Sequence, residues 1–590
     1  MLSLLSHILQ NPENRDDSVL KMLNAGKISS TLAASALIAG CGGGQGTDTV
    51  SLNQQLGDSS ASRFLGHASF GANSAEIEKV MSIGPTAWLE EQFSLPQSLH
   101  KEYIDWRTSV IAPMGFGVVP NDFVESFWRQ AVLGGDQLRQ RAAFALSQIF
   151  VVSFADNTVL EMTRGVASYY DMLGKNAFGN FRQLLEDVTL HPVMGIYLSS
   201  LRNQKESTVR APDENFAREV MQLFTIGLYD LNPDGTVKRD SQSNPIETYR
   251  SSDVAGLARV FTGWSWYAGS ENSVRTSAAF FGTPAHPDRD WRPMQAYPDF
   301  HSVSEKRFLG IEIPSQSQPD PAASLKRALD TLFAHPNVGP FIGQQLIQRL
   351  VTSNPSPPYV ARVASAFADN GRGVRGDMKA VWRAVLLDQE ARAEPTGTTG
   401  GKLREPVQRL ANMFRAFDAS SQSGRFTGID NTDDTATRLG QTPMRALSVF
   451  NFFRPAYAPS GSQVERLALV APEMQLVHDV SVAGYLNYIQ EWLGDAPLRD
   501  VQLDFRRASK LADDPDRLTT HLILLIAAGD LPASLHSAIV SAVTDRAIPA
   551  PLVDAIGAVQ NQAEIDRSTL DRVRIAAMLI MASPDYLVQR

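Results

Sequence analysis

The strongest candidate for a chemical site is a short polar stretch, residues 212–225, which reads PDENFAREVMQLFT. On a helix with about 100° per residue, its polar side chains fall on one arc and its apolar side chains on the other. The polar arc contains no lysine and combines carboxylate, amide and guanidinium groups, which suits fixed, hydrogen-bonded side chains that line a cleft. The residues of this arc are Glu214, Asn215, Arg218, Glu219, Gln222 and Thr225.

The same arc is also typical of an ordinary amphipathic helix with a hydrated face. On such a face Glu214 and Arg218 form a surface pair worth roughly 0.2–0.5 kcal/mol. We favour a buried network around Arg218 and Glu219, because Phe216 and Phe224 anchor the opposite face.

Further candidates lie in three other stretches. His301 and Lys306, in FHSVSEKRFLG, could carry protons or bind an anion, or could belong to a polar loop that returns to the core. Arg404 and Glu405, in KLREP, could bind an anion or form a salt bridge at the start of a helix. Trp264 could form a ligand platform, although core or lid positions are commoner for such a residue.

Together these side chains could support a hydrolase. Either Glu214 or Glu219 would be the general base and His301 the proton shuttle. Arg218, Lys306 and Arg404 would form an anion clamp, with Glu405 beside it. Asn215, Gln222 and Trp264 would bind the ligand. The sequence offers no evident nucleophile, and its histidines never pair at a spacing of three or four, so we expect neither a cofactor nor a metal site.

Two motifs resemble ligand sites but have simpler interpretations. Residues 371–376, GRGVRG, match a dinucleotide-binding pattern, but a helix rather than a strand is predicted before them. Residues 230–235, DLNPDG, match the start of a calcium loop, but Ser241 occupies the position of its bidentate glutamate. We expect turns at both places.

Cys41 is the only cysteine, which excludes an intrachain disulfide. Lys21 and Lys27 precede it, followed by the small and apolar stretch ISSTLAASALIAG at 28–40, the layout of a secretory signal. Residues 38–41, IAGC, resemble the lipobox of bacterial lipoproteins, in which the thiol is lipidated. The sequence therefore predicts a signal peptide at 1–40, with Met22 as an alternative start, and a lipid anchor at Cys41. A buried apolar N-terminal helix with a free cysteine is the alternative interpretation.

The chain has 590 residues, with 54 Lys and Arg against 63 Asp and Glu, which gives a net charge of −9. This balance, without a long basic run, argues against a nucleic-acid partner. No uninterrupted apolar window is long enough for a transmembrane helix. We expect a protein of the cell envelope, periplasmic or on the outer membrane, held by its lipid.

Helical periodicity dominates the chain and predicts a mainly α fold, a large multi-helical domain with one small β-hairpin near 236–249. Two long irregular loops are expected at 267–306 and 418–442. The predicted organisation is a signal peptide at 1–40, a flexible tether at 41–60, a helical main lobe at 61–400 and a C-terminal helical lobe at 401–590.

Over roughly residues 60–590 the chain resembles a large bacterial family, domain of unknown function 1800. The resemblance implies an exported, largely helical protein whose family has no established activity. Members are often encoded beside a second exported family that resembles sulfatases and phosphatases. Many members have Trp-His-Asn-His after the LRQR-like stretch, where this chain reads Ala-Leu-Ser-Gln at 145–148. The segments that carry the resemblance are FLGHASFGA, LRQRAAFALSQIF, PDENFAREVMQLFTIGLYDLNPDG, ARVFTGW, FHSVSEKRFLG, HPNVGPFIGQQLIQRLVTSNPSPPYV, GKLREPV and LGQTPMRALSVFNFFRP.

Two functions follow from these observations. The first is a lipid-anchored envelope protein that binds or assembles an exported partner, such as a sulfatase- or phosphatase-like protein. The second is a hydrolase-like envelope enzyme with a carboxylate–Arg–His site. An enzyme requires Arg218, Glu219, His301 and Arg404 to converge on one open pocket, whereas a binding protein can leave them apart or bury them in satisfied pairs.

Overall fold

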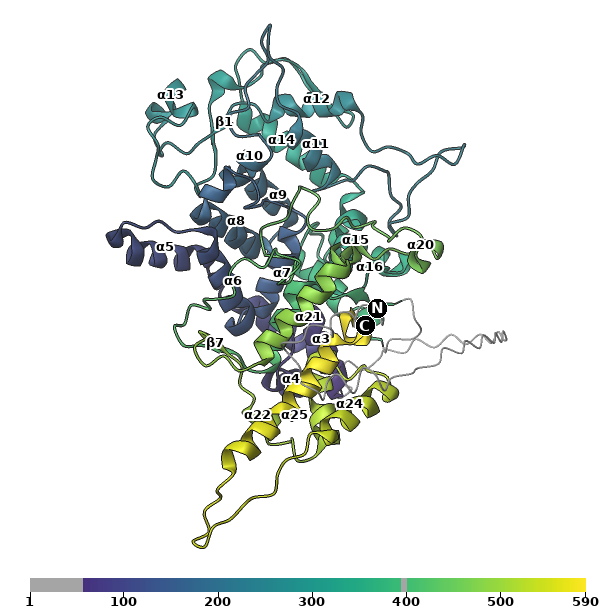
Figure 1. Cartoon of the computed structure of the whole chain (residues 1–590). Helices are drawn as coiled ribbons and strands as arrows, with labels where there is room; N and C mark the ends of the chain where they lie inside the picture. Colours follow the sequence, from purple (N-terminus) through teal and green to yellow (C-terminus); the bar gives the residue numbers. More distant parts are fainter. Residues whose placement is uncertain (1–56, 394–399) are drawn as a thin grey trace.

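The computed structural model describes residues 57–393 and 400–590, and most of these residues are helical (Figure 1). The predicted mainly α fold class is confirmed. Within those two ranges no helix is both long and apolar enough to cross a membrane. The helices before residue 300 are α3 (Asp58–Ala68), α4 (Ser74–Ser94), α5 (His100–Ile111), α6 (Pro120–Leu133), α7 (Gln137–Ser147), α8 (Thr163–Asn176), α9 (Phe181–Leu190), α10 (Pro192–Tyr197), α11 (Asn215–Gln222), α12 (Ser251–Val260) and α13 (Ser277–Phe280). Those after it are α14 (Pro321–Ala334), α15 (Val338–Leu350), α16 (Pro357–Ala368), α17 (Met378–Leu386), α18 (Gln389–Arg392), α19 (Pro406–Ala416), α20 (Gln463–Arg466), α21 (Asp479–Leu493), α22 (Arg506–Ser509), α23 (Pro515–Ala527), α24 (Ala533–Asp545), α25 (Gln562–Ala582) and α26 (Pro584–Leu587).

Local sequence signals set several helix boundaries. The Asn73 side chain accepts a hydrogen bond of 2.9 Å from the Glu76 amide and starts α4. Gly84, with φ of 80°, kinks this helix just before Pro85. The GRGVRG motif at 371–376 follows α16 and leads into α17, whose first turn is capped by Asp377. With a helix in front of it, this motif lacks the strand of a dinucleotide site.

The strands are short and pair in antiparallel twos. The structure has β1 (Trp264–Ser265) with β2 (Gln295–Ala296), β3 (Lys306–Phe308) with β4 (Ile311–Ile313), β5 (Lys402–Leu403) with β8 (Val588–Gln589) and β6 (Ser420–Ser421) with β7 (Val501–Gln502). The sequence predicts none of these pairs, because strands of two or three residues are too short to show an alternating pattern of apolar and polar residues. In the β5–β8 pair, Lys402 lies opposite Gln589.

The hairpin predicted near 236–249 takes the form of isolated bridges on an exposed arm. Arg239 pairs with Pro245, and Leu231 pairs with Val237 across the turn. At that turn the Asp234 carboxylate accepts hydrogen bonds from the backbone amide and the hydroxyl of Thr236. The calcium-like motif is therefore closed by its own hydrogen bonds.

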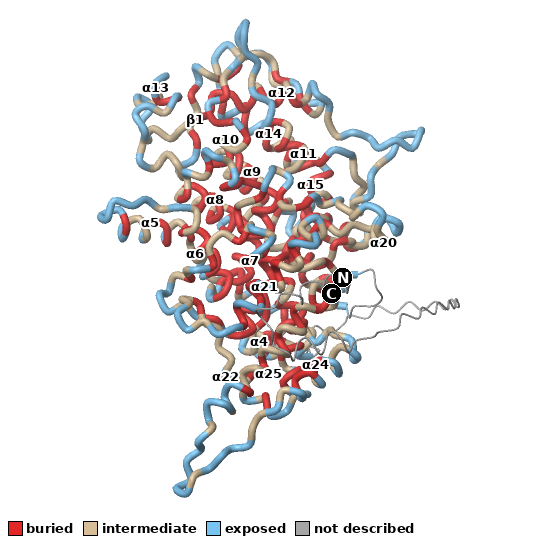
Figure 2. Tube along the Cα trace, viewed as in Figure 1, coloured by how far each residue is buried: buried red, intermediate tan, exposed pale blue. Residues whose placement is uncertain are grey.

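The main core is a continuous cluster of buried side chains that runs from Ala61 in α3 to Tyr586 in α26 (Figure 2). A second, small cluster contains Ala279, Phe280 and Tyr297. Every residue of α19 and every residue of α7 except Arg139 is buried. Helices enclosed on all sides have no hydrated face, so their polar residues need partners inside the protein. This requirement applies to Arg141 in α7 and to Arg409 and Arg415 in α19.

Residues of both predicted lobes contribute to this core, and residues 394–399, at their proposed junction, lie outside the described residues. The division at residue 400 stays a prediction. The predicted signal peptide at 1–40 and the anchor at Cys41 also lie outside the described residues. Helix α3 begins at Asp58, inside the segment predicted as tether.

Close helix packing leads to a test with two matched glycines. A Cβ added at Gly256 in α12 would overlap the Arg307 carbonyl oxygen, whereas one added at Gly66 in α3 would have no neighbour within 4 Å. We expect Gly256→Ala to lower the free energy of unfolding by about 1–3 kcal/mol. Gly66→Ala should raise it by about 0.5–1 kcal/mol through helix propensity. Denaturant unfolding measures both, and equal shifts would contradict the packing of α12 on β3.

Candidate functional site

The predicted polar helix is α11, and Arg218 lies on its outer side. Arg218 pairs with Glu214 across 3.3 Å, and their side chains are 43% and 45% exposed. Asn215 is exposed, and Gln222 accepts a hydrogen bond of 3.0 Å from the Tyr249 hydroxyl. The buried network predicted around Arg218 is wrong, because only the inner face of this short helix is covered by the rest of the protein. The apolar residues buried on that face are Phe216, Ala217, Val220 and Met221.

Glu219 differs from its neighbour because it is buried. The Oε2 atom of Glu219 has no hydrogen-bond partner among the described residues. Burial raises the pKa of the Glu219 carboxyl, and the nearby Arg218 charge opposes that shift. Glu219 is thus the most chemically perturbed member of the polar arc, but no histidine, lysine or second carboxylate of the described chain forms a hydrogen bond or ion pair with it.

His301 is a fully buried core histidine. Its Nδ1 lies 2.8 Å from the Thr262 carbonyl oxygen, which only accepts, so Nδ1 carries the proton. Its Nε2, 3.1 Å from the Ser324 hydroxyl, then accepts. Burial lowers the pKa of His301 to about 4. Both ring nitrogens are occupied and the ring is neutral at pH 7, which leaves no free nitrogen for proton transfer to a ligand.

Lys306 and Trp264 are also part of the packed interior. The Lys306 ammonium donates to the Ser304 carbonyl and to Gln316 Oε1 at 3.3 and 3.2 Å. Burial lowers the pKa of Lys306 to about 8. Trp264 in β1 is buried, and its indole N–H has no partner within the described ranges. Neither residue lines either of the two pockets described below.

Arg404 and Glu405 are neighbours in the chain but belong to different surroundings. The Arg404 guanidinium lies 4.7 Å from the centre of the Tyr586 ring and donates to the Tyr586 carbonyl oxygen. Burial lowers its pKa. Glu405 is fully buried, and its Oε2 accepts hydrogen bonds from the side-chain amides of Gln148 and Gln441. Thus Arg404 faces the C-terminal segment and Glu405 faces the core.

Glu405 belongs to a group that we call the buried charge cluster: Arg141, Arg349, Lys402, Glu405 and Glu473. The Lys402 ammonium lies 3.0 Å from Glu473 Oε1 and 3.8 Å from Glu405 Oε1. Burial lowers the pKa of Arg141 and of Arg349 to about 10, with partial compensation from Glu405 and Glu473. Burial also raises the pKa of Glu473.

The buried charge cluster caps the carboxyl end of α15. The Arg349 carbonyl, in the last turn of that helix, accepts from Arg141 at 2.7 Å and from Lys402 at 2.8 Å. The Leu350 carbonyl accepts from the Gln589 side chain at 2.7 Å. Cationic donors are favoured at a helix C-terminus because they satisfy its free carbonyls and the negative end of its dipole. The cluster is therefore part of the scaffold.

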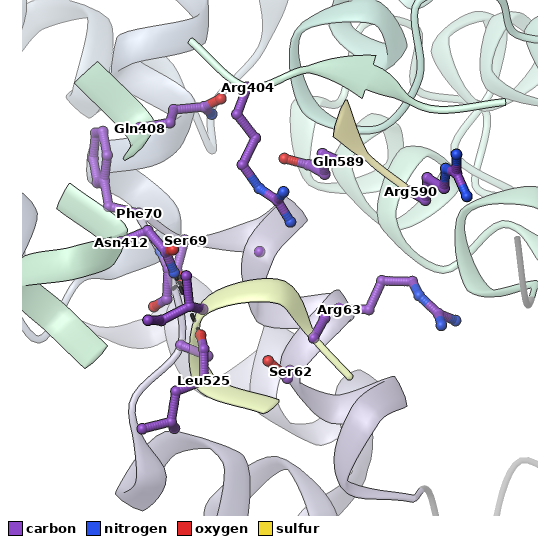
Figure 3. Close-up of a pocket in the computed structure, with 15 residues that line it drawn as sticks. Ser62, Arg63, Ser69, Phe70, Arg404, Gln408, Asn412, Leu525, Gln589 and Arg590 are labelled. Carbon is purple, nitrogen blue, oxygen red and sulfur yellow. Dashed lines mark hydrogen bonds between the residues drawn. The ribbon is translucent and has the colours of Figure 1, made fainter. Parts of the chain in front are cut away.

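The pocket beside this cluster is small (Figure 3). Its volume is about 30 Å³, and Arg404 extends into it. That volume holds a water-sized group rather than an organic substrate. Its polar lining contains no Asp or Glu and consists of Ser62, Arg63, Ser69, Arg404, Gln408, Asn412, Gln589 and Arg590.

The predicted catalytic side chains do not converge on either of the two pockets. A larger depression of about 310 Å³ lies against Trp492, Arg499 and Arg574 and contains none of them. Residues 57–393 and 400–590 also contain no group of three or more His, Cys, Asp or Glu side chains suited to a metal ion. Among the described residues, the side chains of Glu219, His301 and Arg404 form no hydrogen bond or ion pair with one another, and their catalytic roles stay predictions.

Sequence reasoning missed most of the buried charge cluster. Arg141 follows the apolar spacing of its helix, since Leu138 and Ala145 lie on the same side of α7. A charged residue in a buried stripe is a signal that its partner is also buried. The sequence did not identify that partner, because Arg349 lies in a helix far along the chain.

Comparison with protein families gives one result. Residues 63–588 match the family described as "Protein of unknown function (DUF1800)". Because this match covers nearly the whole chain, the protein belongs to that family. No curated protein and no solved structure matches the chain. The quoted segments LRQRAAFALSQIF, GKLREPV and LGQTPMRALSVFNFFRP bring Arg141, Lys402, Glu405 and Gln441 to the buried charge cluster and its edge.

Removal of Lys402 tests the cluster. Lys402→Met leaves two buried carboxylates without their cation, and we expect a loss of about 3–5 kcal/mol in the free energy of unfolding. The matched control is Lys79→Met, which breaks a half-exposed pair with Glu91 and should cost within about 1 kcal/mol. Adding Glu473→Gln to Lys402→Met should restore part of the loss. Equal unfolding of parent and Lys402→Met would mean that these carboxyls are protonated in the fold.

The surface position of Arg218 leads to the opposite expectation. Arg218→Ala removes one half-exposed pair, so its free energy of unfolding should stay within about 0.5 kcal/mol of the parent. Denaturant unfolding at neutral pH provides the measurement. A loss above about 2 kcal/mol would show that Arg218 compensates the buried charge of Glu219, as the predicted network requires.

Proposed function

We propose that the protein is an exported, lipid-anchored protein of the cell envelope that binds or assembles an exported partner. One observation carries this proposal over the hydrolase: the pocket that Arg404 enters is water-sized, and neither Glu219 nor His301 lines it. A hydrolase needs its acid, base and anion donors around one substrate. Binding needs only an exposed surface.

The outline of the molecule supports this choice. Figure 2 shows three exposed projections of the chain. Each of them carries several exposed large apolar side chains, which mark candidate interaction surfaces. They are the end of α5 with the connection to α6, the arm at 228–246, and the arm at 552–559, where Leu552, Val553 and Ile556 are exposed. The third arm presents no charged residue except Asp554, which is bonded within the arm.

The anchor rests on Cys41 and the lipobox-like residues before it. Cys41→Ala should release the protein from the membrane fraction or leave its signal peptide uncleaved, because no thiol is available for lipidation. Fractionation with mass measurement of the N-terminus checks this, and Ser51→Ala is the control. A Cys41→Ala protein that is cleaved normally and stays in the membrane would overturn the anchor.

Partner binding is tested by cross-linking the lipidated protein in its own envelope, followed by mass spectrometry. The variant Leu552→Ser/Ile556→Ser changes only exposed side chains, and Val209→Ser/Leu498→Ser is the matched control. A sulfatase- or phosphatase-like protein that is captured by the parent and control, but not by the arm variant, would support the proposal. Hydrolysis of sulfate or phosphate esters by the purified protein, abolished by Glu219→Gln, would favour the enzyme instead.

A further inference from the structure

The end of α5 forms an exposed apolar projection, here named the apolar tip, residues 106–119. It comprises the last turns of α5, the 3₁₀ helix η1 (Ala112–Met114) and the connection to α6. Figure 1 shows it extending from the body of the molecule at the left. Its exposed side chains are Trp106 at 48%, Val110 at 38%, Met114 at 67%, Phe116 at 68% and Val119 at 53%.

The composition of the apolar tip is unusual for a surface. From Thr108 to Asn121 the chain contains no charged residue. An exposed loop usually carries polar and charged side chains that interact with water. Here the most protruding side chains are Met and Phe, on either side of Gly115, whose φ of 83° allows the sharp turn.

The base of the apolar tip is held in place. Arg107 pairs with Asp122 at 2.8 Å, and the other oxygen of Asp122 accepts from the Val119 amide at 2.8 Å. Behind this pair the Tyr103 hydroxyl donates to Glu125 at 2.6 Å. The exposed apolar surface is therefore a built feature of the fold.

The charges around this base are already paired with one another. Lys101 and Arg164 both bind Asp105, at 2.6 and 2.7 Å. On the other side, Arg425 binds Glu125 at 2.7 Å. A partner that recognised the tip through ion pairs would have to break these contacts. The tip thus offers hydrophobic contact on a convex surface and few polar groups.

A lipid bilayer is the partner that these properties fit. A protein interface commonly has a polar rim with about one hydrogen bond per 100–200 Å². From Thr108 to Val119 the tip has no charged side chain to form one, and Arg107 at its base is already paired with Asp122. A convex apolar loop with a tryptophan at its base is suited to the boundary between headgroups and acyl chains, where tryptophan is enriched.

The lipid anchor, which belongs to the proposed function, makes this contact possible. The described fold begins at Gly57, sixteen residues after Cys41. Those residues span at most about 55 Å. We propose that the apolar tip inserts into the outer part of a lipid bilayer and holds the folded protein against the membrane that carries its anchor. Because its charges are paired, insertion is driven by apolar burial and needs no anionic lipid.

The test uses the chain from residue 42 to 590, which lacks the lipidated thiol and keeps the whole described core. Sedimentation with phosphatidylcholine vesicles, with and without phosphatidylglycerol, measures binding. The tip variant is Met114→Ser/Phe116→Ser, and Val209→Ser/Leu498→Ser is the control, since both of its residues are isolated and more than nine-tenths exposed. Circular dichroism verifies that each variant is folded.

We expect the parent and the control to bind both kinds of vesicle with little salt dependence. The tip variant should bind at least roughly tenfold more weakly. Equal binding by all three proteins, binding only to anionic vesicles, or no binding by the parent would each overturn the insertion. If the parent binds no vesicles but a protein can be cross-linked to residue 116, the insertion is also overturned, and the tip is assigned to a protein partner. These readouts are independent of Cys41, so they fail separately from the proposed anchor.

Discussion

The central constraint on this fold is that five charged groups must lose their water together. Arg141, Arg349, Lys402, Glu405 and Glu473 come from α7, α15, β5, the start of α19 and η5 (Pro472–Leu476). Dehydration costs several kcal/mol per ion, so the cluster is tolerable only when its members meet with good geometry. Apolar contacts alone are not directional and fix the position of one helix along another less strictly than hydrogen bonds do. Here the hydrogen bonds of Arg141 and Lys402 to the Arg349 carbonyl tie the end of α15 to α7 and β5.

The same need for buried partners applies to several of the residues that are most promising for chemistry. Glu405, His301 and Lys306 have the functional groups of catalysts, but each is buried and forms hydrogen bonds inside the protein. The apolar projections at the periphery, in contrast, have no partner in the fold. The described chain thus keeps these polar groups in its interior and leaves apolar side chains exposed at its periphery, an arrangement that agrees with the proposed binding role.

The local parts of this structure were predictable because their causes are local. Asn73 caps a helix, Gly84 kinks it, and the glycines at 371–376 form a turn with positive φ angles. Each of these effects acts within one turn of chain. The spacing of polar residues predicted which side chains share a face of α11, but not which of them the rest of the protein would bury. Arg218 and Glu219 are adjacent, yet Arg218 is half-exposed and Glu219 is buried. The five-member cluster could not be predicted, because its residues are joined only by tertiary packing. The two-residue strands lack any periodic signal.

The pairing of β5 with β8 links folding to the order of synthesis. Lys402 lies opposite Gln589, and Arg404 bonds to the carbonyl oxygen of Tyr586. Neither contact can form until residues 586–589 have been synthesised. Contacts of such sequence separation are slow, since a long loop must close before they form. During synthesis of the whole segment between the two strands, β5 and its charged neighbours therefore lack their pairing strand, and a chaperone that binds the chain at this stage meets an unpaired strand edge.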